Sequence, residues 1–190
     1  MVLLRKSIPQ SRNLKAAAEL NVSMGKMNLI LSKALACECE EIYSVLMENA
    51  LWLESLNILQ WPVDWLESKK VEIYNSIVEG NFYVLKVGGS IEAVVEVKSE
   101  PEKIWGYDNT PSIYIHKLAK RRNTENKYIG EIVLFLISKM SSKFEVSAIR
   151  LDCISSNHKL RKYYLSKGFE FCGNVSNGEV ELSLYQKSIS

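Results

Sequence analysis

The chain has 190 residues, a length that fits one domain with a full hydrophobic core. Hydrophobic residues make up 47% of it and charged residues 24%, which is the balance of an ordinary soluble globular protein. The formal net charge is only +2, so the composition argues against a generally basic surface that would bind nucleic acid or an anionic membrane.

Residues 1–27 differ from the rest, because they carry five basic side chains and a single acid, Glu19. We expect an N-terminal extension here, with an accessory helix, followed by one domain over residues 28–190. Residues 17–23 have some likeness to the first half of a helix-turn-helix, so a DNA-binding regulator is an alternative. The recognition helix would fall on residues 27–35, which look more like a strand. We therefore expect no nucleic-acid partner.

The first half of the domain predicts one strand, two helices and a hairpin. The strand covers residues 28–34, and a helix with an apolar face at 3.6-residue spacing runs from about residue 40 to 57. A second helix begins at Pro62 and ends at Glu79-Gly80. Strands over residues 82–87 and 91–97 follow, joined by Gly88-Gly89-Ser90, which suits a tight turn.

The second half alternates strands and helices. It predicts a strand over residues 112–119, a basic loop, a helix over 129–140, a strand over 148–154 and a helix over 157–167 that Gly168 ends. Two strands, over 169–171 and 180–185, close the chain on either side of a turn-rich stretch at 174–178. A meander followed by a strand–helix–strand unit predicts a mixed α/β sheet.

The loop at residues 120–128 leads into a helix at Ile129-Gly130. A helix N-terminus has unpaired N–H groups and the positive end of the helix dipole, and both attract phosphate. A glycine there lets a ligand approach the backbone, and Lys120 and Lys127 add positive charge. These residues by themselves leave two interpretations open, an anion site or a solvated basic loop.

Two segments carry a resemblance to a known family: HKLAKRRNTENKYIGEIVLFLI from His116, and RLDCISSNHKLRKYYLSKGFEF from Arg150. With the order of elements over about residues 28–185, they resemble the GNAT superfamily of N-acetyltransferases. The resemblance implies an α/β (α+β) fold whose mixed, mostly antiparallel central sheet is flanked by helices and has splayed central strands. It also implies transfer of an acetyl group from acetyl-CoA to the primary amine of a small molecule or peptide, by direct attack in a ternary complex, and a possible homodimer.

The resemblance implies a set of cofactor-binding residues. The family's pyrophosphate loop matches residues 125–130, although Glu125 and Tyr128 depart from its pattern and only Gly130 is kept. These departures motivate an alternative, a catalytically degenerate GNAT-fold protein that binds a cofactor or partner. The coenzyme A contacts implied are the main chain of Leu118 and Lys120, the loop and helix start at Glu125, Asn126, Lys127, Tyr128, Ile129, Gly130 and Glu131, and Asn157 after the later strand.

Two catalytic residues are expected. Tyr164 matches the family's general acid, with its neighbour Tyr163 the weaker choice. His116 is a candidate general base because an imidazole titrates near neutrality, and the alternative is a solvated position on the outer strand face. Weaker candidate bases are Glu92, Glu96 and Asp152. Trp61 and Trp65 would either wall the acceptor pocket or pack in the core.

We expect no metal site and a cytoplasmic location. The four cysteines lack a second close pair and a neighbouring histidine, so they make a poor zinc pattern and suggest reduced, mostly buried thiols. No apolar run reaches the roughly 18 residues of a membrane span, and the N-terminus has no apolar stretch long enough for a signal peptide.

Overall fold

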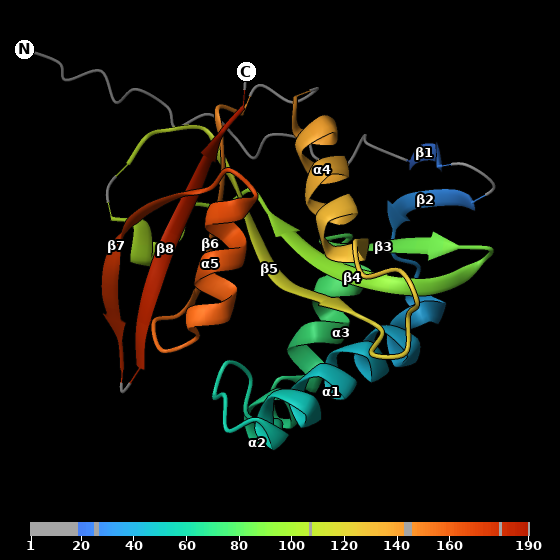
Figure 1. The fold of residues 1–190 in the computed structure, drawn as a ribbon, viewed down its shortest axis with the longest axis horizontal. Coiled ribbons are helices and arrows are strands. Elements are labelled where there is room, and N and C mark those ends of the chain that lie inside the picture. Colours follow the sequence, from blue (N-terminus) through green and yellow to red (C-terminus); the bar gives the residue numbers. More distant parts are fainter. Residues whose placement is uncertain (1–18, 25–26, 107, 143–145, 179, 190) are drawn as a thin grey trace, which may run out of the picture.

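The computed structural model describes residues 19–24, 27–106, 108–142, 146–178 and 180–189. They form one sheet with the strand order β1-β2-β3-β4-β5-β6-β8-β7 (Figure 1). Neighbouring strands are antiparallel except β5 and β6, so the mostly antiparallel sheet expected from the sequence is confirmed. The strands are β1 Glu19–Met24, β2 Met27–Lys33, β3 Phe82–Val87, β4 Ser90–Lys98, β5 Ser112–Lys120, β6 Ala148–Ile154, β7 Glu170–Asn177 and β8 Val180–Ser188.

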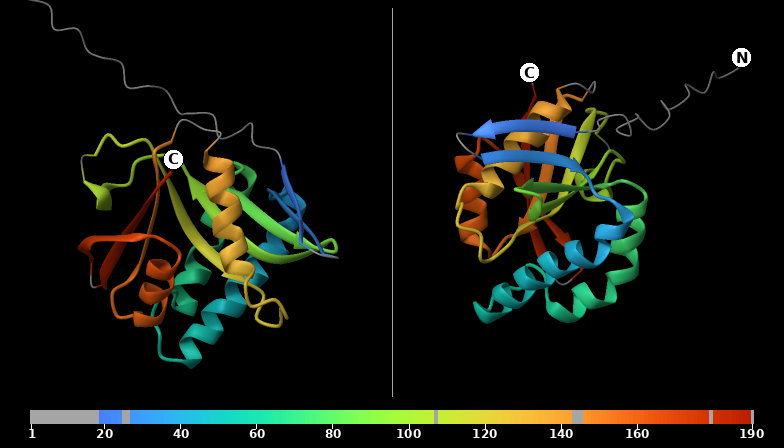
Figure 2. Two further views of the ribbon diagram at one scale, coloured as in Figure 1. Left: turned by 45° about the horizontal axis from the view of Figure 1, so that its top comes forward. Right: turned by 90° about the vertical axis from the view of Figure 1, so that its right-hand side faces the viewer.

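Helices cover both faces of the sheet, as the views in Figure 2 show. One face packs against the apolar side of α4 and against α5, and the other packs against α1 and α3 in a second core. None of the described helices is long and apolar enough to cross a membrane. The helices are α1 Cys39–Ser55, α2 Val63–Ser68, α3 Lys70–Val78, α4 Ile129–Ser141 and α5 His158–Ser166, with short 3₁₀ turns at η2 Ala36–Glu38 and η3 Lys103–Trp105.

The N-terminal expectation was wrong where it can be compared. Residues 19–24 are strand β1, which pairs antiparallel with β2 and extends the sheet past the expected boundary at residue 28. Strand β1 covers most of residues 17–23, which were considered as the first half of a helix-turn-helix, and strand β2 stands where its recognition helix would fall. Residues 1–18 and 25–26 lie outside the described residues.

Three smaller differences have local causes. The helix expected from Pro62 to residue 79 divides in two at Lys69, whose φ and ψ of −94° and 1° interrupt the helical turn. Strand β7 continues to Asn177, so most of the expected turn at 174–178 is paired with β8. The thiols are free but only Cys153 is buried, since Cys37 and Cys172 are exposed.

The two central strands separate midway along their length. Parallel pairing joins Ser112–Ile115 of β5 to Ala148–Leu151 of β6 and stops there. Beyond it, β5 contains a bulge, because two of its residues lie opposite Val95 alone between the pairs Val94↔Ala119 and Glu96↔His116. This geometry opens the wedge between neighbouring strands that the sequence resemblance implied.

The bulge includes a strained residue that a buried ion pair holds. Lys117 has φ +46°, in the left-handed region that side chains other than glycine rarely adopt. Its Nζ lies 2.6 Å from Oε2 of Glu96, which is only 1% exposed and also accepts a hydrogen bond from Ser76. The pair therefore fixes the backbone of β5 at the mouth of the wedge.

Candidate active site

A cavity of about 1040 Å³ lies where β5 and β6 separate. Strand alternation puts His116 and Asp152 on the face toward α1–α3, since their neighbours Ile115 and Leu151 point into the α4 core. Tyr164 belongs to the α4 core, yet it also lines the cavity. The wedge thus lets groups from the two faces of the sheet reach one space.

The start of α4 supplies main-chain donors at one end of this cavity. The N–H groups of Gly130 and Glu131 have no hydrogen-bond partner among the described residues. The next two donors back along the chain are engaged within the loop. Tyr128 N–H donates to Asn126 Oδ1 at 2.9 Å, and Ile129 N–H donates to the Asn126 carbonyl at 3.3 Å. Two amides are therefore free for an anion, and the Tyr128 amide also becomes free if the Asn126 side chain turns away.

The side chains of the loop divide between cavity and solvent. Lys127 lines the cavity, whereas Tyr128 is 57% exposed and is not among the lining residues. Glu125 is exposed as well, and Glu131 makes an ion pair of 2.7 Å with Lys167 of the turn after α5. Neither departure from the family pattern therefore fills the wedge.

The basic segment that ends β5 is partly neutralised by α1. Arg121 binds Glu48 at 2.5 Å and Glu41 at 3.0 Å, so its charge is already balanced. Lys120 lines the cavity, but its carbonyl accepts a hydrogen bond of 2.8 Å from the buried side chain of Asn49 on α1. A ligand that hydrogen-bonded to the Lys120 carbonyl would therefore share it with Asn49.

Two tyrosines of α5 close the cavity from the α4 side. Tyr164 is 6% exposed among Phe169 and Tyr185, and burial raises the pKa of its hydroxyl far above the ordinary value. Burial, with a smaller effect of Glu131, raises the pKa of Tyr163 to about 12. A Cβ on Gly130 would lie 3.1 Å from the Tyr163 hydroxyl, so glycine allows α5 to approach the start of α4.

Asn157 holds α5 in this position. Its Oδ1 accepts the N–H of Leu160 at 3.2 Å, which caps the first turn of the helix. The side chain is buried and lines the cavity. The family resemblance implied a place near the cofactor, which stays a prediction, and the structure shows that Asn157 fixes the helix that carries both tyrosines.

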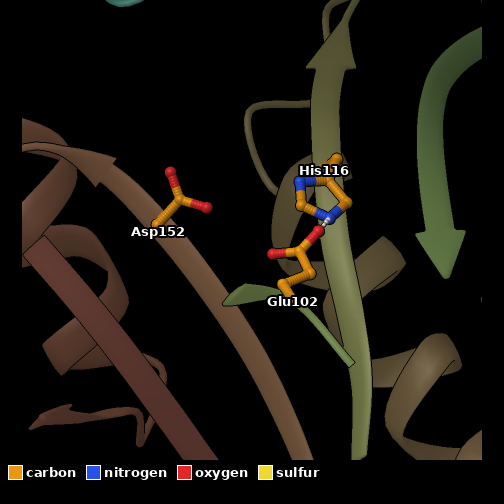
Figure 3. Close-up of side chains that lie close together, drawn as sticks. All are labelled: Glu102, His116 and Asp152. Atoms are coloured by element: carbon orange, nitrogen blue, oxygen red, sulfur yellow. Dashed lines mark ion pairs between the residues drawn. The ribbon is translucent and has the colours of Figure 1, made fainter. Parts of the chain in front are cut away.

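Three titratable side chains meet on the α1–α3 side of the wedge (Figure 3). His116 Nε2 lies 2.6 Å from Glu102 Oε1, although the angle does not make a hydrogen bond, and Asp152 faces the pair from β6. Burial raises the pKa of Asp152; the charge of Glu102 adds to this effect and His116 opposes it. His116 is thus inside the cavity, and not on a solvated outer face.

The trio includes a residue that sequence reasoning missed. Glu102 comes from the turn-rich stretch after β4, just before η3, where no periodicity indicates its direction. Glu102, His116 and Asp152 each offer one ligand atom, and these atoms lie within 4.8 Å of one another. The three residues could therefore hold a divalent cation. No spacing pattern in the sequence indicates that these three residues would meet.

Glu96 and Glu92, the other two acids considered as general bases, are less suited to accept a proton in the cavity. Burial raises the pKa of Glu96, but Lys117, Ser76 and Lys98 outweigh it, and the pKa falls below its ordinary value. A carboxylate so firmly paired is a poor proton acceptor. Glu92 is half-buried on β4 and does not line the cavity.

Aromatic residues form the far end of the cavity. Trp61 and Trp65 line it together with Trp52, over whose ring Arg122 lies at 3.6 Å from the centroid. Gln60 Oε1 accepts the N–H of Ile154 at 3.1 Å, which ties the loop between α1 and α2 to the end of β6. This contact holds the loop that carries Trp61 against β6, and the tryptophans line the same cavity as His116, Glu102 and Asp152.

Comparisons with known proteins agree with this architecture. No protein-family model matches the chain. It is 30% identical over 159 residues to YesJ of Bacillus subtilis, described as an uncharacterized N-acetyltransferase, and the match covers 80% of this chain and 86% of that protein. A GNAT-family acetyltransferase from Listeria monocytogenes has 22% identity and a TM-score of 0.72, over 89% of this chain and 99% of that one.

A second solved structure was determined with coenzyme A. The PaiA N-acetyltransferase from Thermoplasma acidophilum has 18% identity and a TM-score of 0.64, over 84% of this chain and 98% of that one. At such identities the solved structures show the shared fold, while YesJ shows the relationship in sequence. The chain belongs to the GNAT family of acetyltransferases.

Proposed function

We propose that the chain transfers an acetyl group from acetyl-CoA to a primary amine within a ternary complex. The observation that carries the proposal is the wedge between β5 and β6, which brings His116 and Tyr164 to one cavity from opposite faces of the sheet. The family relationship supports the reaction, and the coenzyme A in the PaiA structure supports the donor.

The cofactor would bind between α4 and the open edge of β5. Free amides at Gly130 and Glu131, near the ammonium of Lys127, fit a diphosphate. The main chain of Leu118 and Lys120 would pair with the pantetheine arm, close to Asn157. The remaining contacts proposed are the loop residues Glu125, Asn126, Tyr128 and Ile129.

The reaction needs one proton acceptor and one proton donor. The acceptor amine loses a proton to His116 as its nitrogen attacks the thioester carbonyl, and a main-chain N–H of the β5 bulge stabilises the oxyanion. The thioester carbon–sulfur bond then breaks, and the thiolate takes a proton from Tyr164. Burial raises the pKa of the phenol above the ordinary ~10, so Tyr164 stays protonated at neutral pH and its hydroxyl is present where the thiolate forms.

A thiol-release assay with acetyl-CoA and a panel of primary amines tests the proposal. We expect release that requires both an amine and the protein, and mass spectrometry should find the amine heavier by one acetyl group. Release at the same rate without any amine would contradict amine transfer.

The engaged amides of Tyr128 and Ile129 favour one alternative, a GNAT-fold protein that has lost catalysis. Calorimetric titration with acetyl-CoA separates the two. An enzyme binds the cofactor at micromolar to low millimolar concentration, whereas no heat of binding at millimolar ligand would support the alternative.

A further inference from the structure

The acceptor end of the cavity contains a carboxylate without a cationic partner. Asp152 makes no hydrogen bond or ion pair within the described part of the chain, although its side chain lies in the cavity wall. The titratable groups that face it are Glu102 and His116, and these two are already in contact with each other. An enclosed carboxylate of this kind is stabilised by a cation that enters the cavity.

A second observation is the apolar surface around this carboxylate. Trp65 is 41% exposed, Leu56 43% and Leu59 63%, and all three line the cavity with the half-buried Trp61. Exposed aromatic and aliphatic side chains that converge on a concave site are typical of a binding surface for an apolar ligand. The wall comes from α2 and from the end of α1 with its following loop, which Gln60 ties to β6.

We propose that the acceptor is a primary amine on an apolar, flat body, with no carboxylate next to the amine. This inference rests on the proposed function and names its substrate class. The ammonium form of the amine would bind beside Asp152 with its apolar body against Trp65 and Trp61. It releases one proton to water, and the neutral amine then loses its second proton to His116 as it attacks. A free α-amino acid would place a second carboxylate near Asp152 and Glu102, where like charges repel.

One feature of the cavity opposes this inference. Lys103 of η3 also lines the cavity and could accept the carboxylate of an amino acid. Its side chain is exposed, so water screens its charge more than it screens the enclosed Asp152. Which of the two charges governs recognition is therefore a measurable question.

Tryptamine and tryptophan form a matched pair of probes, because they differ only in the α-carboxylate. Binding of each is measured by calorimetry on the intact protein with coenzyme A present, and EDTA prevents a divalent cation from reversing the charge of the trio. We expect tryptamine to bind at least tenfold more tightly, and Asp152→Asn to reduce this ratio to about threefold or less. Lys103→Met should leave the ratio unchanged.

The inference is overturned if tryptophan binds as tightly as tryptamine, or if Lys103→Met is the variant that changes the ratio. Ethylamine tests the apolar body. It should bind at least tenfold more weakly than tryptamine, and Trp65→Ala should weaken tryptamine alone; equal affinities would contradict the apolar part. Circular dichroism and thermal melting confirm that each variant is folded.

Turnover separates this inference from the proposed function. Tight binding of tryptamine with no acetylated product would contradict acetyl transfer and leave the ligand class supported. Acetylation of tryptophan in preference to tryptamine would support acetyl transfer and contradict the proposed acceptor class.

Discussion

The two ends of the cavity are built in different ways. The proposed cofactor end consists of main-chain amides at the start of α4 together with α5, and it follows directly from the two strand–helix connections. The proposed acceptor end is made of side chains from η3, β5, β6 and the α1–α2 loop. The hydrogen bond between Gln60 of that loop and Ile154 of β6 joins residues that are about half the chain apart. Backbone donors bind a constant group, whereas side chains on separate elements can vary with the substrate. Variants at the two ends should therefore change different quantities.

The largest effect is expected at the acceptor end. His116→Gln should lower kcat/KM about 100-fold, because the amine loses its proton acceptor, while the Kd of acetyl-CoA stays within about twofold. Steady-state kinetics and calorimetry measure the two quantities. Glu102→Gln is the matched control and should cost less, since it removes only the partner of the imidazole. An equal loss of cofactor affinity would mean that the two ends are not separate.

Tyr164→Phe should lower kcat about tenfold or more and leave acetyl-CoA affinity nearly unchanged, because only the proton donor is removed. Since the pKa of Tyr164 is raised, its hydroxyl stays protonated and the rate should not fall through its deprotonation below about pH 10. Tyr163→Phe is the control. If it alone lowered turnover, the donor would be Tyr163.

The ion pair between Lys117 and Glu96 holds the bulge of β5, and it should contribute more to the free energy of unfolding than a surface pair. Glu96→Gln leaves the Lys117 ammonium without its partner and should cost about 3 kcal/mol of unfolding free energy. Glu131→Gln, at a pair exposed by 48% on the acid side, should cost under about 1 kcal/mol. Urea titration measures both, and equal costs would remove the proposed support of the bulge.

The same pair predicts a pH dependence. The folded-state pKa of Glu96 is lowered, so its contribution is fully present above the unfolded value of ~4.3 and is lost as pH falls through the folded pKa. The stability difference between wild type and Glu96→Gln should therefore shrink below about pH 4.

The smallest effect is expected at the cofactor loop. Lys127→Met should weaken acetyl-CoA binding about threefold to tenfold, more at low salt, without changing the KM of the acceptor. Tyr128→Gly should change this affinity by less than about threefold, because the tyrosine ring lies outside the cavity. A large gain in affinity for Tyr128→Gly would show that the ring blocks the ligand in solution.

From residue 28 onward, the sequence by itself predicted the order of strands and helices and the resemblance to the family, although one expected helix divides at Lys69 and β7 is longer than expected. Periodicity located the helices. It could not indicate β1, because six residues with mixed polarity become a strand only when β2 offers hydrogen-bond partners.

Only the tertiary structure decided which side chains meet. Arg121 lies in the basic segment before α4 but is bound by two glutamates of α1, more than 70 residues away in the chain. Glu102 joined the site from a turn whose sequence has no periodic pattern, and Asn126 engaged amides that the motif left free. Such pairings depend on where loops pack in space, and local propensity carries no information about contacts between segments that are distant in the sequence.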